Sequence, residues 1–385
     1  MQTNIKLYDL LRRTADAAME IQNSDGSFPP GTNVYYNDPE TPVRNTSHWL
    51  MILLKVYTYT NDDKYKIAAA KAVDYLLSKE VRPMGASFWC RKNPHKDFCN
   101  GTVGQAFTLD ALAQAYEVLQ MEAVKNLADE VFLLHPFDEK NALWRSVAVD
   151  GSYLPIDPTF NHQLWFAVAG AELWRVGKNE EIGRRVRLFL DALHRNMNVH
   201  KFGHKGLIYH YVSRHHSFRK KGIIPHLKTL KLLIGQQRKN EIIRAIRYHC
   251  FNLWAFPILK NVFSENDFWY SKKFKSTFNY IFSNDFTKHE ESLGLKKPNS
   301  VYKFENINIY EAYTILAFCD IEDKEQIVEE LLSTHFEQEY DSETDMVNRL
   351  AADKLTQAAR VYEATRLPNL ELKLKNLNIA DRQEG

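Results

Sequence analysis

The amino-acid sequence predicts an all-α fold in which helical hairpins close into an (α/α)6 toroid, with the long loops gathered at one mouth. Long polar loops alternate with tight turns along the chain, so successive helices are expected to form antiparallel pairs. The first helix of each pair is the more apolar, as in 50–54 and 164–169, and we expect it to lie on the inside of the ring. Hairpins that cannot bury their apolar faces alone are expected to stack and close.

Each expected helix follows from apolar side chains spaced about 3.6 residues apart. The first spans 7–21, where Leu7, Leu10 and Leu11 share one face. The hairpins then pair 46–59 with 65–78, 104–119 with 123–134, 160–175 with 182–197, and 309–318 with 325–335, before a last helix at about 347–364. The turn at 60–63 offers Asp as an N-cap.

The middle of the chain departs from this alternation. Residues 204–212 alternate like a short strand, 213–221 form a basic loop, and 223–236, 240–258 and 268–282 have helical spacing. No domain boundary is indicated, so we expect one toroid domain over 1–385 with an irregular basic segment at 201–262.

Composition excludes several classes of protein. The 385 residues are 44% hydrophobic and carry a net charge of +2, which gives no overall indication of nucleic-acid binding. The N-terminus has no apolar signal region and no stretch of about 18 apolar residues occurs, so we expect a cytoplasmic protein. The four cysteines form no CxxC pair and no disulfide framework is expected.

Charge is distributed unevenly along the sequence. Residues 201–250 hold twelve Lys and Arg against one acid, and residues 322–345 hold ten acids against one base. The basic segment could contact a membrane surface or a lipid-linked anionic glycan. The alternative is a solvated basic face that balances a solvated acidic one.

The loops that lead into the expected inner helices deliver polar side chains to the mouth. Asp157 and His162 are five residues apart across a loop-to-helix junction, so both can face one cavity and act as acid or base. Glu311 lies on an otherwise apolar inner helix, where an unpaired carboxylate is costly. We expect these three residues to be catalytic; the structural alternative is that Asp157 caps the helix and His162 bonds a backbone carbonyl.

Aromatic rings and amides near the same mouth are expected to bind substrate, because sugars present flat faces and many hydroxyls. The candidates are His48, Trp49, Trp89, Asn100, Gln105, Tyr153, Asn161, Gln163 and His210, with Trp165, Asp97, Asp150, His204 and Glu305 nearby. Asp25, in Asp-Gly-Ser, is expected to be a turn residue.

The pattern resembles the six-hairpin toroid superfamily of carbohydrate-active proteins. Residues 99–106 (CNGTVGQA) and 302–306 (YKFEN) with Tyr310-Glu311 are similar to segments of toroid proteins from surface-glycan gene clusters. The resemblance implies an active site at the mouth and a glycan intermediate as substrate. The basic segment at 201–250 favours a glycan that carries negative charge. Glycoside hydrolysis and sugar epimerisation both remain open, as does a non-catalytic glycan-binding or membrane-associated scaffold in polysaccharide biosynthesis.

Other chemistries have weaker signals. Cys90, His95 and Cys99 lie within ten residues, but zinc needs a fourth ligand such as His48 or His162, and we expect neither a metal nor a cofactor. Residues 99–101 are faintly similar to a segment of zinc-dependent lanthionine cyclases, whose later Cys-His pair is reversed here at His249-Cys250. Residues 22–28 resemble the repeat of terpenoid-cyclase toroids, without the acidic motif that terpene chemistry requires.

Overall fold

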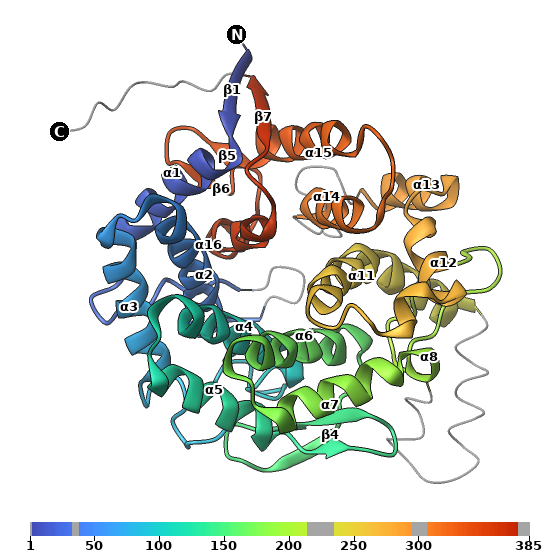
Figure 1. Cartoon of the computed structure of the whole chain (residues 1–385), viewed down its shortest axis with the longest axis horizontal. Helices are drawn as coiled ribbons and strands as arrows, with labels where there is room; N and C mark the ends of the chain where they lie inside the picture. The colour runs from blue at the N-terminus through green and yellow to red at the C-terminus, as the bar shows by residue number, and fades with distance from the viewer. Residues whose placement is uncertain (1, 33–37, 214–234, 295–305, 376–385) are drawn as a thin grey trace.

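The computed structural model describes residues 2–32, 38–213, 235–294 and 306–375. Within these ranges the chain forms a ring of helices around a central axis (Figure 1). The inner segments are α2 (Val43–Thr60), α4 (Gly101–Leu119), α6 (Phe160–Gly177), α11 (Gly235–Val262), α14 (Ile307–Phe318), and α16 (Lys354–Ala359) continued by the 3-10 helix η2 (Arg360–Arg366). Each packs on the next in this order, and η2 packs back on α2, so the inner ring is closed.

The second helix of each hairpin lies outside this ring, as the sequence predicts. The outer elements are α1 (Leu7–Glu20), α3 (Asp63–Leu77), α5 (Glu122–Leu134), α7 (Glu180–Asp191), α8 (Leu193–Asn196), η1 (Asp267–Tyr270), α12 (Lys272–Tyr280), α13 (Asn284–Leu293) and α15 (Lys324–Glu339). The side chains of the inner helices are buried on almost every face, since they pack against outer helices on one side and against each other on the other. The all-α toroid is therefore confirmed.

Short strands complete the ring. β1 (Gln2–Lys6) pairs antiparallel with β7 (Glu371–Lys375), so the two ends of the described chain lie side by side (Figure 1). β2 (Phe137–Asp138), β3 (Leu143–Val147) and β4 (Tyr153–Ile156) form a small sheet inside the expected loop before α6. β5 (Tyr340–Asp341) and β6 (Met346–Val347) form a hairpin after α15.

Several expected elements differ in the structure. The prediction of a last helix over 347–364 is wrong for its first part. Asp353 accepts a hydrogen bond from Thr356 N at 3.0 Å and so caps α16, which begins only at Lys354. The expected strand at 204–212 is reduced to isolated bridges at Ile208 and Tyr211. The predicted Asp62 N-cap is confirmed, with Lys64 N donating at 3.0 Å. Most of the basic loop and of the expected helix at 223–236, together with Glu305, lie outside the described residues.

Two further findings bear on the sequence-based expectations. Asp25 accepts hydrogen bonds from Ser27 N at 2.9 Å and Ser27 Oγ at 2.7 Å, which confirms it as a turn residue. No helix in the described ranges has both the length and the apolar character that a membrane-spanning segment requires.

Candidate functional site

A cavity of about 250 Å³ opens where the N-terminal ends of the inner helices meet. Its walls come from the loops before α2 and α4 and from the first two turns of α2, α4 and α6. His210, the middle of α11 and η2 complete the circle. The lining residues are Asp38, Arg44, His48, Arg91, Lys96, Asn100, Val103, Phe107, Thr159, Asn161, His162, His210, Tyr248, Phe251, Arg360, Tyr362 and Glu363.

Asp157 and His162 form a hydrogen-bonded pair in the wall of this cavity. His162 Nδ1 lies 2.7 Å from Asp157 Oδ2, and the imidazole lines the cavity while the carboxylate is buried behind it. Burial opposes ionisation of Asp157, but the charge and hydrogen bond of His162 and the backbone N–H groups of Thr159 and Thr102 together lower the pKa of Asp157 below its usual value. A carboxylate only accepts hydrogen bonds, so the proton of this bond lies on Nδ1, and in the neutral form of the ring Nε2 is available as a base.

The N-terminus of α4 holds the carboxylate of Asp157 in place. Asn100 (φ +57°) and Gly101 (φ +60°), where α4 begins, both have left-handed backbone conformations. Thr102 N donates to Asp157 Oδ2 at 3.4 Å and Gly101 N donates to Asp97 Oδ1 at 2.8 Å. The positive end of the helix dipole therefore stabilises both carboxylates.

Two further imidazoles and one amide reach the cavity with unused hydrogen-bonding capacity. Within the described part of the chain, both ring nitrogens of His48, Nδ1 of His210 and Oδ1 of Asn161 are buried and have no hydrogen-bond partner. Burial, followed by the charge of His162, lowers the pKa of His210 to about 3, and burial beside Arg44 and Arg360 holds the pKa of His48 well below its usual value. Both rings are therefore neutral at pH 7, so each can donate one hydrogen bond and accept another, as sugar hydroxyls require.

Four cations line the cavity against two carboxylates. Each cation is held by an ion pair. Arg44 Nη2 lies 2.6 Å from Glu40 Oε2, and Arg91 Nη2 lies 2.8 Å from Asp97 Oδ2. Lys96 Nζ lies 2.5 Å from Asp38 Oδ2, and Arg360 Nη2 lies 3.0 Å from Glu363 Oε1. Asp38 and Glu363 are the carboxylates in the lining, so the wall carries an excess of two positive charges when its imidazoles are neutral. Behind the wall, burial raises the pKa of Glu40 to about 7, which leaves that residue only partly charged at neutral pH.

The wall formed by η2 combines an aromatic face with a buried carboxyl. The ring of Tyr362 stacks on His48 with centroids 4.1 Å apart. Glu363 accepts hydrogen bonds from Tyr310 Oη at 2.9 Å, Asn306 Nδ2 at 2.7 Å and Arg360 Nη2 at 3.0 Å. Burial raises the pKa of Glu363, and the charge of Arg360 opposes this effect.

The structure brings some of the predicted site residues together and leaves others outside the cavity. His48, Asn100, Asn161, His162 and His210 line it, with Asp157 directly behind.

Outside the cavity, Trp49 is buried against Phe28, and the indole of Trp89 donates to Arg91 O at 2.8 Å. Tyr153 is 61% exposed on β4, and Glu311 is buried on α14 but is not part of the lining.

Gln105 and Gln163 bind backbone instead of facing the cavity. Gln105 accepts from Phe88 N at 2.8 Å and donates to Phe88 O at 3.1 Å and Cys99 O at 2.9 Å. Gln163 accepts from Trp144 N at 2.9 Å and donates to Trp144 O at 2.8 Å and to Asp157 O at 2.9 Å. Each amide therefore ties the preceding loop to its inner helix, a structural role in place of the predicted substrate contact.

Sequence reasoning did not identify much of the cavity wall. The lining residues that it did not predict are Asp38, Arg44, Arg91, Lys96, Val103, Phe107, Thr159, Tyr248, Phe251, Arg360, Tyr362 and Glu363. Arg44 lies four residues before His48 and could have been found, because residues at that spacing share one helix face. The η2 residues gave no such signal, because their proximity to α2 arises only when the ring closes.

The thiols near the site are buried. Cys90 and Cys99 are almost inaccessible, His95 is exposed, and burial raises the pKa of both thiols far above the usual value. In the described ranges no three His, Cys, Asp or Glu side chains gather in a way that could hold a metal ion.

Comparison with solved structures identifies the architecture. The chain is similar to an α-1,6-mannanase of a Salegentibacter species in complex with α-1,6-mannotriose, with a TM-score of 0.57, 12% identity, and coverage of 93% of this chain and 98% of that one. It is similar to cellobiose 2-epimerase from Bacillus thermoamylovorans (TM-score 0.59, 12% identity, 92% and 97% covered) and to a D-mannose isomerase (TM-score 0.59, 14% identity, 93% and 94% covered). The protein thus shares the six-hairpin (α/α)6 toroid fold of these structures.

A sequence relative gives the family. No family model matches the chain. Over 380 residues it is 38% identical to archaeal glycosylation protein Q of Haloferax volcanii, covering 96% of this chain and 99% of the relative. The chain belongs to the family of archaeal glycosylation protein Q.

Proposed function

We propose that this protein is an enzyme that processes a negatively charged saccharide of a glycosylation pathway by acid/base chemistry. The observation that carries the proposal is the Asp157–His162 pair, whose imidazole faces a cavity walled by four cations. The name of the Haloferax relative and the sugar-acting structural neighbours support a glycan as substrate.

In the proposed mechanism His162 is the proton-transfer group. Its Nε2 takes a proton from the bound sugar, and the Asp157 carboxylate stabilises the imidazolium that forms while keeping the ring in one orientation. Asn161 and the neutral rings of His48 and His210 bind hydroxyls. Arg44, Arg91, Lys96 and Arg360 supply the positive field for a carboxylate or similar anion.

Among sugar reactions, the lining favours epimerisation or isomerisation. These reactions move a proton to and from carbon, and imidazoles are the proton-transfer groups that line the cavity. Hydrolysis would instead use two carboxyl groups on either side of the bond. Of the carboxylates in the described lining, Asp38 is paired with Lys96 and Glu363 with Arg360, and Asp157 lies outside the lining, behind His162.

One observation keeps hydrolysis as the second candidate. In the order of the ring, η2 lies opposite α6, so Glu363 faces the wall that carries His162. The raised pKa of Glu363 is the property that a general acid requires. In that reaction Glu363 would protonate the leaving oxygen and His162 would activate water.

The experiment incubates the protein with a panel of uronate and neutral oligosaccharides in deuterated water. Deuterium uptake at carbon and new reducing ends are measured for the wild type, His162→Ala, Asp157→Asn and Glu363→Gln. We expect carbon-bound deuterium without cleavage, and a loss of about 10²–10⁴-fold in His162→Ala and Asp157→Asn. New reducing ends that disappear in Glu363→Gln would establish the hydrolase instead.

Exposed His194 provides the matched control, since His194→Ala removes an imidazole that is not part of the cavity lining. Equal activity of His194→Ala and His162→Ala would contradict the proposal. So would glycan binding without turnover that is unchanged in every variant, an outcome expected of a non-catalytic scaffold.

A further inference from the structure

We infer that the cavity is closed at its inner end and admits only the terminal unit of a glycan, so that the protein acts at a chain end and not within a chain. This inference rests on the proposed function and specifies the substrate of the same site. It is carried by the order of side chains along the inner segments, from the mouth toward the opposite end of the ring.

The inner helices α4 and α6 show the same order of layers. On α4 the cavity residues Asn100 and Val103 come first, Phe107 follows one turn later, and Asp110 comes one turn beyond. On α6 the order runs from His162 through Trp165 to Glu172. With a rise of 1.5 Å per residue, Glu172 lies about 15 Å along α6 from His162.

The first closing layer is aromatic. The Trp165 ring packs against Phe107 at 6.2 Å, Phe251 at 5.0 Å and Trp254 at 4.5 Å between centroids. Trp254 in turn stacks on Tyr310 at 5.2 Å. These rings come from four inner helices, so together they span the ring and form the floor of the cavity.

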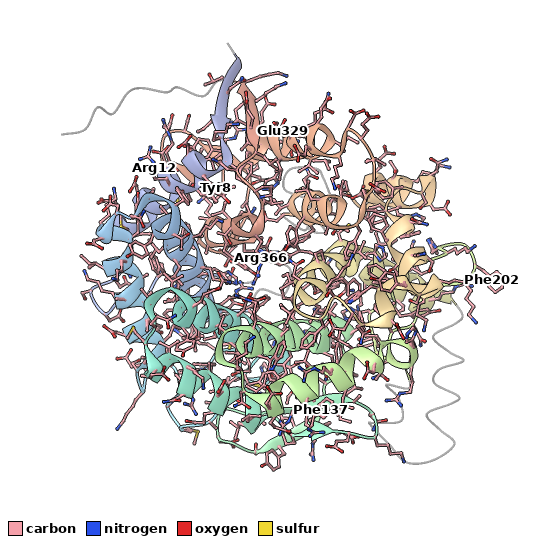
Figure 2. All side chains as sticks on the ribbon, in the orientation of Figure 1. Tyr8, Arg12, Phe137, Phe202, Glu329 and Arg366 are labelled. Atoms are coloured by element: carbon pink, nitrogen blue, oxygen red, sulfur yellow. The ribbon has the colours of Figure 1, made fainter. Side chains whose placement is uncertain are left out.

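The second closing layer is ionic and lies beneath the rings. Arg366, near the axis of the ring in Figure 2, donates to both carboxylate oxygens of Asp110 at 2.7 and 2.8 Å. Its Nη1 lies 3.8 Å from Glu172, which also pairs with Arg175 at 2.9 Å. Arg366 is paired on both sides and removing one partner would leave a buried charge, so this layer does not open readily.

The groups proposed to bind sugar hydroxyls can be reached only from within the cavity. His48 is 2% exposed, Asn161 3% and His210 9%, so a sugar must enter past the mouth to contact them. The volume of about 250 Å³ lies below the range of about 300–1,000 Å³ for pockets that bury drug-sized ligands. An internal unit would need both flanking chains to leave through the same mouth, whereas a terminal unit needs only one exit.

The test uses two sets of trisaccharides of glucose and glucuronate, one with the glucuronate at a chain end and one with it in the middle. Affinity is measured by calorimetry and the contacted sugar unit by saturation-transfer NMR. We expect the terminal set to bind tighter by about tenfold or more, with saturation concentrated on its glucuronate. Equal affinity and evenly spread saturation for the two sets would overturn the inference while leaving the proposed function intact.

A variant pair separates the cavity from general effects on folding. Val103 lines the cavity, whereas Val118, near the far end of the same helix, does not. Val103→Phe is expected to abolish binding of the terminal set, and Val118→Phe to preserve it. If neither set binds or reacts with the wild type, the proposed anionic saccharide is wrong, and the inference fails with it.

Discussion

Gly101 has no side chain at the point where α4 approaches the carboxylate of Asp157. A Cβ added there would lie 2.5 Å from Asp157 Oδ2, closer than real contacts allow, and 3.0 Å from His162 Nδ1, which is tighter than most. The residue also has φ +60°, where side chains are strained. At the scale of single residues, the close approach of helix terminus, carboxylate and imidazole therefore requires glycine.

Gly101→Ala is expected to separate Asp157 from His162 as well as to strain the backbone. The measurements are urea unfolding and the downfield Nδ1–H proton resonance of His162, assigned by its loss in His162→Ala. Gly85 (φ +73°) has no atom within 4 Å of an added Cβ, so Gly85→Ala reports strain alone. We expect Gly85→Ala to lose about 1–2 kcal/mol and keep the resonance. An unchanged resonance in Gly101→Ala would contradict this role.

At the scale of elements, two inner helices are attached to their loops by the same device. Gln105 is the fifth residue of α4 and Gln163 the fourth of α6. Each bonds both backbone groups of a buried residue in the connection before its helix, and also a carbonyl six residues before itself. The loops before α2 and α6 also contain the same Asp-Gly-Ser turn. Asp25 accepts a hydrogen bond from Ser27 N, and Asp150 accepts one from Ser152 N, each at 2.9 Å. The hairpins thus share loop anchors as well as helices.

Gln163→Ala is expected to cost about 2–4 kcal/mol of unfolding free energy, because it leaves the buried N–H and C=O of Trp144 unsatisfied. Gln326→Ala serves as the control, since Gln326 is exposed and bonds only Glu330. The two variants are compared by urea denaturation. Equal stability of the two variants would mean that the hydrogen bonds of Gln163 to Trp144 contribute little to the free energy of unfolding.

These anchors also explain what the sequence could and could not predict. The inner and outer helices were predictable because each buries one face, and the apolar residues of that face recur about every 3.6 residues within a short stretch of sequence. Gln105 and Gln163 were predicted to bind substrate because the sequence does not show whether a polar side chain at the start of a helix bonds a ligand or the backbone of the preceding loop. Arg360, Tyr362 and Glu363 were missed as site residues because their neighbour His48 lies over 300 residues earlier. The Asp157–His162 contact was predictable because it spans one loop-to-helix junction.

At the scale of the whole molecule, folding buries a set of uncharged imidazoles. Burial is the first cause that lowers the pKa of each, to about 3 for His210 and His249 and to about 4 for His135 and His200. The unfolded chain binds protons near pH 6.5 that the folded chain does not. Stability from these groups is therefore complete above pH 6.5 and is lost as the pH falls toward the folded values.

The free energy of unfolding is expected to fall steeply between pH 6.5 and 5, with a slope of about 1.4 kcal/mol per pH unit for each such histidine. His135→Phe should reduce that slope by one such contribution, because His135 is fully buried beside Phe166. His194→Ala, an exposed position, should leave it unchanged. Urea midpoints at successive pH values measure the slope, and identical slopes in all three proteins would rule out this account.

The closure of the ring by residues near both ends of the sequence has a consequence for synthesis. η2 packs on α2, β1 pairs with β7, and one wall of the cavity is made of Arg44 and His48 from early in the chain with Arg360 and Tyr362 from late in it. These are contacts of very high sequence separation, which form slowly and late. A nascent chain on the ribosome can therefore bring Asp157 and His162 together long before it has a complete cavity. The wall of the candidate site can be complete only when translation has passed residue 363.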